Sequence, residues 1–438
     1  MNINTLNPLI EEVINKIKIK ISSVEFIAKH RVSEKAFTRK RVFTFQILFS
    51  ILINILKSCL STELDNFFKF LSNSAYLVSE ATDGAFSKAR KKLKETAFVE
   101  LFQIITSDFY NHFEYKRWHG YRLIACDGTK LNLPKNSDTI KAFGKSSNQQ
   151  QGFYVQAQAS TLYDVLNEFI IDAHIDHIKI GEHALLGKHL PFLRPTDILL
   201  ADRGYPCFWL LAYLLKHNIN FCLRANTTNT WKEITLMLAN GETDKIVSLP
   251  FSYKSIKNLK KLGLTKDPVS VRVSIVELND GDKEVLISSL IDQTEFSPEM
   301  LKDLYFLRWG IEEKYKQTKH RVEIANFSGK TPISIRQDFF AKIFTMNLTA
   351  LLMFPVKQQI IEDSVDRKYK YKTNWSKALG KVKNFAFKMF LVDPVLTFIE
   401  NLQFFFRKYI IPIRPNRSYP RKKNNIARKY HSTYKSHS

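Results

Sequence analysis

The sequence is poor in residues that mark several classes of protein. It has four cysteines in 438 residues, Cys59, Cys126, Cys207 and Cys222. They form neither a CxxC pair nor a Cys/His group with zinc-site spacing. This excludes a disulfide scaffold or a zinc finger, and we expect reduced, mostly buried thiols, which favours the cytosol.

Other functional signals are missing as well. The first residues include acids and do not have the layout of a secretory signal. There is no glycine-rich phosphate loop, so nucleotide hydrolysis is not indicated. There is also no nucleophilic Ser or Cys motif and no internal repeat.

Acidic residues are outnumbered. The chain has 42 Asp+Glu against 66 Lys+Arg, a formal net charge of +24. Such a surplus attracts polyanions, because each neutralised phosphate releases a condensed counterion. Nucleic acid is the expected partner, and an anionic membrane surface is the weaker alternative because the basic residues are spread along the chain.

The most hydrophobic stretch covers residues 42–60 and is close to membrane-spanning length. It contains Gln46, Asn54 and Lys57, which would be costly in lipid. We therefore expect a buried core helix and no membrane partner.

The predicted secondary structure changes several times along the chain. The first 115 residues predict helices and include a basic segment with Lys88, Arg90 and Lys92, which indicates either DNA contact or a solvated helix face. Strands then alternate with helices, which is typical of an α/β sheet. The segment TWKEITLML and three later runs predict a β-rich insertion, and the end of the chain is a basic tail without acids. The expected regions are 1–115, helical and DNA-binding; 116–225, the first part of the α/β core; 226–295, the insertion; 296–345, the second part of the core; and 346–438, helical with the tail.

Two buried-strand runs end in an acid that is followed by or close to glycine. Asp127 ends RLIACD before Gly128, and Asp202 ends DILLAD two residues before Gly204. The carboxyl ends of strands in α/β sheets are the usual positions of functional sites. A single such Asp is commonly a turn or cap residue, but two in one basic α/β unit indicate a site.

A third acid lies in a predicted helix over residues 297–319. At about 100° per residue, one face carries Tyr305, Arg308, Glu312, Lys316 and Lys319. Glu313 points about 100° away. Leu304, Leu307 and Ile311 form an apolar stripe beside that face. The simpler interpretation is a helix with an ordinary Arg308–Glu312 ion pair.

Three carboxylates suit phosphodiester chemistry. Two divalent ions about 4 Å apart can hold the attacking and leaving oxygens of an in-line displacement. Hard ions such as Mg²⁺ or Mn²⁺ prefer carboxylate oxygens. We therefore expect Asp127, Asp202 and Glu312 to be catalytic and to bind two such ions.

These motifs resemble the IS4 family of DDE transposases. Tyr305, Arg308, Glu312 and Lys319 match that family's Y-(2)-R-(3)-E-(6)-K signature, and DGT at Asp127 and ADRGY at Asp202 resemble its two aspartate motifs. The likeness extends over roughly residues 30–425. It implies an α/β fold with an RNase H-like catalytic core, a β-rich insertion, a helical N-terminal DNA-binding region and a helical C-terminal region.

The resemblance also implies a function. It implies cleavage and strand transfer of element-end inverted-repeat DNA into target DNA, by a homodimer in the synaptic complex. Tyr305, Arg308 and Lys319, with Lys316, Trp309 and Arg203, would contact DNA. The hairpin route of that family stays open, as do two alternatives: a nuclease of the same class without strand transfer, and a catalytically inactive DNA-binding protein.

Several other residues have two interpretations. Trp309 and Trp231 suit either stacking on a flipped base or core packing. Arg203 suits a phosphate contact or a salt bridge. His174, His177 and His183 straddle a strand-to-helix junction without a common face, and we interpret them as loop or core residues.

Overall fold

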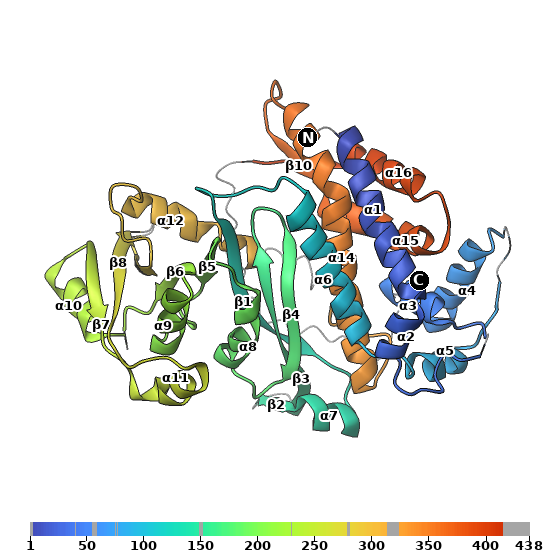
Figure 1. The fold of residues 1–438 in the computed structure, drawn as a ribbon, viewed down its shortest axis with the longest axis horizontal. Coiled ribbons are helices and arrows are strands. Elements are labelled where there is room, and N and C mark those ends of the chain that lie inside the picture. The colour runs from blue at the N-terminus through green and yellow to red at the C-terminus, as the bar shows by residue number, and fades with distance from the viewer. Residues whose placement is uncertain are drawn as a thin grey trace.

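The computed structural model describes residues 3–39, 41–54, 59–74, 76, 78–148, 152–228, 230–277, 281–312 and 324–414. Within them the chain is mixed α/β, with one large mixed sheet and extensive helical regions (Figure 1). The helices are α1 (Ile3–Ser22), α2 (Val24–His30), α3 (Phe45–Ile53), α4 (Leu60–Leu71), α5 (Asp83–Arg90), α6 (Thr96–His112), α7 (Ser137–Phe143), α8 (Glu182–His189), α9 (Phe208–Lys216), α10 (Lys232–Asn240), α11 (Ile256–Leu262), α12 (Pro298–Phe306), α14 (Pro332–Glu362), α15 (Trp375–Leu391) and α16 (Val395–Lys408). The strands are β1 (Arg122–Asn132), β2 (Lys145–Asn148), β3 (Gly152–Asp164), β4 (Phe169–His177), β5 (Asp197–Ala201), β6 (Asn220–Ala225), β7 (Asp244–Leu249), β8 (Val269–Glu277), β9 (Lys283–Ser288), β10 (Tyr371–Thr373) and β11 (Ile410–Pro412).

The centre of the sheet combines antiparallel and parallel pairs. β1 pairs with β3, and β3 with β4, all antiparallel. On the other side β1 pairs with β5, and β5 with β6, both parallel. Every residue of β5 is buried, as expected of a parallel strand covered on both faces.

The three strands from the predicted insertion extend this same sheet. β6 pairs with β9, β9 with β8 and β8 with β7, all antiparallel. The strand prediction for TWKEITLML is wrong, because residues 232–240 form α10. Ile234 and Met237 are one helical turn apart and both buried, and Gly241 ends the helix in the left-handed conformation that glycine favours.

Helices from both ends of the chain form a body that packs against β4 of the sheet. Figure 1 shows α1 to α6 packed together with α14 to α16, although they come from opposite ends of the chain. The side-chain amide of Gln403 on α16 donates to Asn7 on α1 at 2.7 Å in the buried interior. This body thus draws on both ends of the sequence.

The centre of the helical body is α14. Thr331 and Ser334 form a capping box at its start, and its apolar residues lie all round its circumference, as in a helix buried on every side. By length and composition it could cross a membrane, but 94% of its most apolar window is buried inside the protein, which makes it weak evidence for a span. The expected boundary at 345/346 falls within this continuous helix, since no glycine or proline interrupts residues 333–354.

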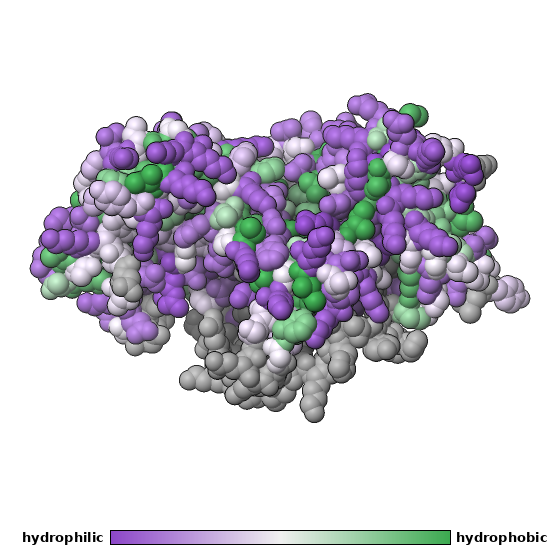
Figure 2. All heavy atoms as spheres, turned by 90° about the horizontal axis from the view of Figure 1, so that it is seen from below, coloured by the Kyte–Doolittle hydropathy of each residue, from purple (hydrophilic) through white to green (hydrophobic). Residues whose placement is uncertain are grey.

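The apolar stretch 42–60 contributes a shorter helix than expected. α3 covers Phe45–Ile53, and its residues from Leu48 to Ile53 are buried. Residues 55–58 and the basic tail from 415 lie outside the described residues. On the face drawn in Figure 2, hydrophilic residues cover most of the surface and hydrophobic ones form small scattered patches.

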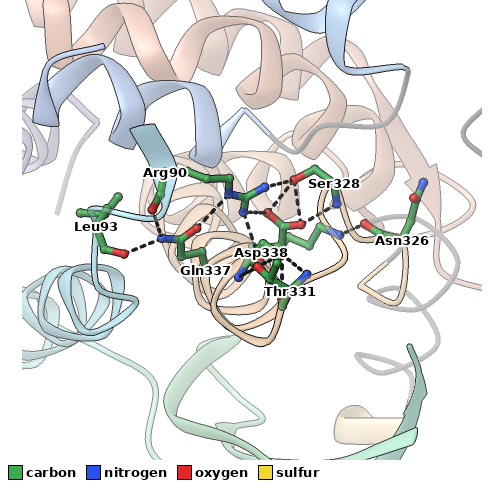
Figure 3. A network of polar contacts seen from close by, with 9 residues as sticks. Arg90, Leu93, Asn326, Ser328, Thr331, Gln337 and Asp338 are labelled. Atoms are coloured by element: carbon green, nitrogen blue, oxygen red, sulfur yellow. Dashed lines mark hydrogen bonds and ion pairs between the residues drawn. The ribbon is translucent and has the colours of Figure 1, made fainter. Parts of the chain in front are cut away.

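Arg90 connects the N-terminal helices to α14 (Figure 3). Its guanidinium donates to Asp338 at 2.7 Å, to Gln337 at 2.9 Å and to Ser328 at 2.7 Å. Arg90 is only 3% exposed. Its inclusion among the DNA-contacting residues is therefore wrong, because this side chain is a buried structural link, whereas Lys88 and Lys91 on the same segment are exposed.

Candidate active site at the ends of β1 and β5

Two aspartates lie side by side at the edge of the parallel pair. The pairing of β1 with β5 ends at Cys126 opposite Ala201, so Asp127 and Asp202 are the next residues on the two strands. Neighbouring strands are about 4.8 Å apart, which brings the two carboxylates close together. Asp127 is not the last residue of β1 as expected. The strand continues to Asn132 along β3, and only its pairing with β5 stops.

The same local geometry orients both carboxylates. The Gly128 N–H donates to Asp127 Oδ1 at 2.8 Å, and the Arg203 N–H donates to Asp202 Oδ1 at 2.7 Å. Each aspartate therefore uses one oxygen to accept from the backbone N–H of the next residue.

The predicted helix over 297–319 is interrupted. α12 ends at Phe306, residues 307–308 form a turn, and helix resumes at 309–312. Leu307 is 37% exposed, so the expected apolar stripe is restricted to Leu304 and Ile311. Lys316 and Lys319 lie outside the described residues.

The turn places Arg308 among the acids. Its Nη2 donates to Glu312 Oε1 at 2.8 Å, and its charge also acts on Asp127 and Asp202. The side chain is 2% exposed. Its Nε is buried without a hydrogen-bond partner among the described residues. Glu312 thus joins the two strand-end aspartates around one guanidinium that retains an unused donor.

Tyr305 lies behind Asp202. Its hydroxyl is 3.5 Å from Asp202 Oδ1, and the residue is 2% exposed. Burial raises the pKa of Tyr305 well above its usual range, so the hydroxyl stays protonated. The buried positions of Tyr305 and Arg308 differ from the exposed DNA contacts expected from sequence, whereas Arg203 is exposed and Trp309 lies at the surface with 36% exposure.

A fourth acid, Glu182, belongs to this cluster and was not predicted. A Cβ at Gly128 would lie 3.0 Å from Glu182 Oε1, and one at Gly204 would lie 3.4 Å from Glu182 Oε2. Glu182 thus lies against the glycines that follow the two aspartates, at the start of α8. The only sequence signal was the pair of glycines, which leave room for an approaching side chain.

Burial and neighbouring charges both act on the pKa of Asp127. Burial raises the pKa of Asp127 to about 6, and the nearby charges of Glu312 and Glu182 add to the rise. The Gly128 N–H and Arg308 oppose it. The protonation of Asp127 is therefore sensitive to pH near neutrality.

A hollow of about 450 Å³ is bordered by Arg203, the residue after Asp202. Its lining also includes Trp209, Asn226 and Trp231. Trp231 precedes the first residue of α10 and is partly buried. Aromatic rings and a cation thus border one space that begins one residue after Asp202.

The donor set fits hard divalent cations. Asp127, Asp202, Glu312 and Glu182 offer only carboxylate oxygens, the ligands that Mg²⁺ and Mn²⁺ prefer. Among the described residues, three ligand-type atoms lie within 4.8 Å of one another at Asp172, His174 and His189, and the four acids are more widely spaced.

Comparison with known proteins decides the family. Residues 118–348, which contain the two aspartates and Glu312, match the family model described as the transposase DDE domain. The chain belongs to the DDE transposase family. Its resemblance to the IS4 group is confirmed by a curated relative, the transposase InsG of insertion sequence element IS4 from Escherichia coli (strain K12), with 22% identity over 278 residues.

The extent of these similarities differs. The match to InsG spans 62% of this chain and 61% of the relative. Among solved structures, the piggyBac transposase in a synaptic complex with hairpin DNA gives a TM-score of 0.48 at 12% identity, over 89% of this chain and 84% of that chain.

Proposed function

We propose that this chain is the transposase of an insertion sequence, which binds element-end DNA and catalyses metal-dependent strand cleavage and strand transfer. The observation that carries the proposal is the meeting of Asp127, Asp202 and Glu312, from three separate segments, around the buried Arg308. The strand order β4-β3-β1-β5-β6, antiparallel for three strands and parallel for the last two, supports an RNase H-like core. The +24 charge supports a DNA substrate.

Each side chain then has a role. Asp127, Asp202 and Glu312 would hold two Mg²⁺ or Mn²⁺ ions, and Glu182 would add a fourth carboxylate. The ions supply a lowered pKa for the attacking water or DNA 3′-hydroxyl and stabilisation of the leaving oxygen. The Nε of Arg308, which has no hydrogen-bond partner among the described residues, would donate to a phosphate oxygen between the acids. Tyr305 positions Asp202, and Arg203, Trp309, Lys316 and Lys319 contact the DNA strand.

The N-terminal helices offer a second surface for DNA. A hollow of about 1080 Å³ is lined by five cationic side chains and one acid, Glu80. The cations are Lys35, Arg39, Arg41, Lys88 and Lys92. This supports a DNA-binding role for the region before residue 115, with residues 116–225 and 296–345 supplying the catalytic core, 226–295 extending its sheet and 346–438 completing the helical body.

The hollow bordered by Arg203 and Trp231 favours the hairpin route. A hairpin requires a distorted duplex, and a flipped base could stack on Trp231 within reach of Arg203. Joining two element ends to a target further calls for a homodimer in the synaptic complex. We place this reaction on DNA in the bacterial cytoplasm.

The test uses oligonucleotide duplexes that carry the inverted repeats flanking the gene. We expect cleavage and joining with Mg²⁺ or Mn²⁺, and loss of both by at least 100-fold in Asp127→Asn, Asp202→Asn and Glu312→Gln with DNA binding retained. Asp267→Asn, an exposed acid on the β7–β8 connection, is the matched control.

The products separate the competing functions. Nicked product without joined product would indicate a nuclease. An inert wild-type protein that still binds the duplex would indicate a DNA-binding protein and would overturn the proposal.

A further inference from the structure

A second group of metal-ligand side chains lies away from the four acids, between α8 and the sheet. Asp172 and His174 are two residues apart on β4 and so project from one face of it. His189 is the last residue of α8. Their ligand-type atoms all lie within 4.8 Å of one another.

Both histidines lie close to the same carboxylate oxygen of Asp172. Asp172 Oδ2 is 2.7 Å from His189 Nδ1 and 2.9 Å from His174 Nε2. The two imidazole rings are 4.7 Å apart between centroids and inclined at 42°. The side chains of Asp172 and His189 are almost fully buried, while that of His174 is 26% exposed and leaves a path from solvent.

The hydrogen-bond directions point to a cation. The Ser160 hydroxyl has one hydrogen and donates it to the Asp127 carbonyl at 3.1 Å. With that hydrogen on the Asp127 carbonyl, Ser160 accepts from His189 Nε2, 3.0 Å away, so Nε2 carries a proton. The contact of Nδ1 with the Asp172 carboxylate then requires either a second proton on His189 or a bound cation between the two groups.

His174 gives an independent sign. Its Nε2 is buried without a hydrogen-bond partner among the described residues, although it lies 2.9 Å from Asp172 Oδ2. A nitrogen so close to a carboxylate but outside hydrogen-bond geometry is oriented as a metal ligand would be. His189 also has the second feature of metal-bound histidines, since its other nitrogen is fixed by a hydrogen bond.

We propose that Asp172, His174 and His189 form a zinc site, separate from the site at Asp127, with solvent as the remaining ligand. Two imidazole nitrogens and one carboxylate oxygen are a donor set that zinc accepts, and Mg²⁺ rarely selects nitrogen. The ion ties α8 to β4. Through His189 and Ser160 it also supports the backbone of Asp127, so zinc positions the strand that carries the first acid of the proposed catalytic site.

The test measures zinc directly. The full chain carrying Asp202→Asn and Glu312→Gln, which weakens competing binding at the acids, is given one equivalent of ZnCl₂, gel-filtered and analysed by mass spectrometry. We expect about one zinc per chain in this background. His174→Gln and His174→Ala should lose it, and His177→Ala, on the same strand, should retain it.

A second readout uses Co²⁺ in place of zinc. A site with two nitrogens and open coordination should give the visible absorption of low-coordinate Co²⁺, lost in the His174 variants. Equal metal content in the His174 and His177 variants would overturn the proposal. So would the absence of visible Co²⁺ absorption in the protein that still has His174. The cluster would then be a hydrogen-bond network with a doubly protonated His189. Because neither readout requires DNA cleavage, this result is independent of the transposase proposal.

Discussion

Arg308 Nη2 lies 2.8 Å from Glu312 Oε1, and the same guanidinium acts on Asp127 and Asp202. One buried cation thus balances carboxylates that come from three different segments. Because its Nε has no hydrogen-bond partner among the described residues, Arg308 keeps one donor in reserve while it is bound to Glu312.

Replacing Arg308 should therefore reduce both activity and stability. Arg308→Gln leaves the acids without their counter-ion, and we expect a loss of about 1–3 kcal/mol in unfolding free energy, below the value for a fully buried pair because Glu312 is partly exposed. Arg308→Lys should restore part of the stability but little of the cleavage, since an ammonium lacks the planar fork. Urea unfolding and cleavage assays measure the two effects. The exposed Arg194→Gln is the control, and an equally active lysine variant would contradict the role of the fork.

The raised pKa of Asp127 predicts that the stability of the folded protein depends on pH. Its pKa is raised from 3.8 to about 6, so the folded protein binds its proton more tightly than the unfolded chain does. The resulting stabilisation is complete below about pH 4 and is lost as the pH rises through 6. Above that pH, Asp127→Asn should stabilise the metal-free protein by about 1–3 kcal/mol. The difference should shrink below pH 4 and when Mg²⁺ is added. An equal difference at all pH values would mean that charge is not its cause.

Gly128 should not tolerate a methyl group. A Cβ there would lie 2.9 Å from the Gln158 amide nitrogen and 3.0 Å from Glu182 Oε1. We expect Gly128→Ala to lower cleavage by about 10-fold, because the side chains of Gln158 and Glu182 must move away from the acids. Gly204→Ala, with a nearest approach of 3.4 Å, should have a smaller effect. Gly187→Ala on α8, where nothing lies within 4 Å, is the control and should be neutral or slightly stabilising.

The effect of the Glu182 charge can be tested separately from the effect of its volume. Glu182→Gln keeps the volume and removes the charge, so it should weaken metal-dependent cleavage and lower the pKa of Asp127, which Glu182 helps to raise. The pH profile of cleavage should move to lower pH. An unchanged profile with full activity would show that Glu182 only fills space.

Arg90 and Lys88 lie on the same helix but should behave differently. Arg90→Ala leaves Asp338 buried without its partner, and we expect a loss of about 3–5 kcal/mol in unfolding free energy with DNA affinity per folded molecule unchanged. Lys88→Ala should leave stability within about 0.5 kcal/mol and weaken DNA binding, with a shallower salt dependence. Thermal unfolding and titrations at several salt concentrations distinguish the two. The reverse assignment would contradict the basic hollow as a DNA surface.

The side-by-side placement of Asp127 and Asp202 was predictable because it follows from the pairing of two strands. Asp127 and Asp202 each follow an apolar run, and parallel strands bring such ends together without further information. The prediction of Glu312 also required the spacing of the Y-(2)-R-(3)-E-(6)-K signature. The IS4 resemblance is confirmed, and the mixed α/β sheet agrees with the expected fold class.

The parts that could not be predicted depend on tertiary contacts. The turn at 307–308 interrupts a segment of good helix formers, because burying Tyr305 against Asp202 and Arg308 among the acids outweighs helix continuity. Arg90 and Asp338 are 248 residues apart, and no local pattern signals their pairing. His189 was not connected with His174 because the two come from different elements. The segment TWKEITLML shows that β-branched residues do not prevent a helix. Its apolar residues are spaced one helical turn apart, so a helix can bury them together.

The packing of α1 against α14 and α16 has a consequence for damaged copies of the gene. A nonsense mutation or frameshift upstream of residue 332 removes the apolar rod around which the first helices assemble. Such a truncated product would expose the inner faces of α1, α3 and α6 to water and be cleared by proteolysis. Truncation before residue 332 should therefore yield no stable protein, so early termination should not produce a shortened fragment that still binds DNA.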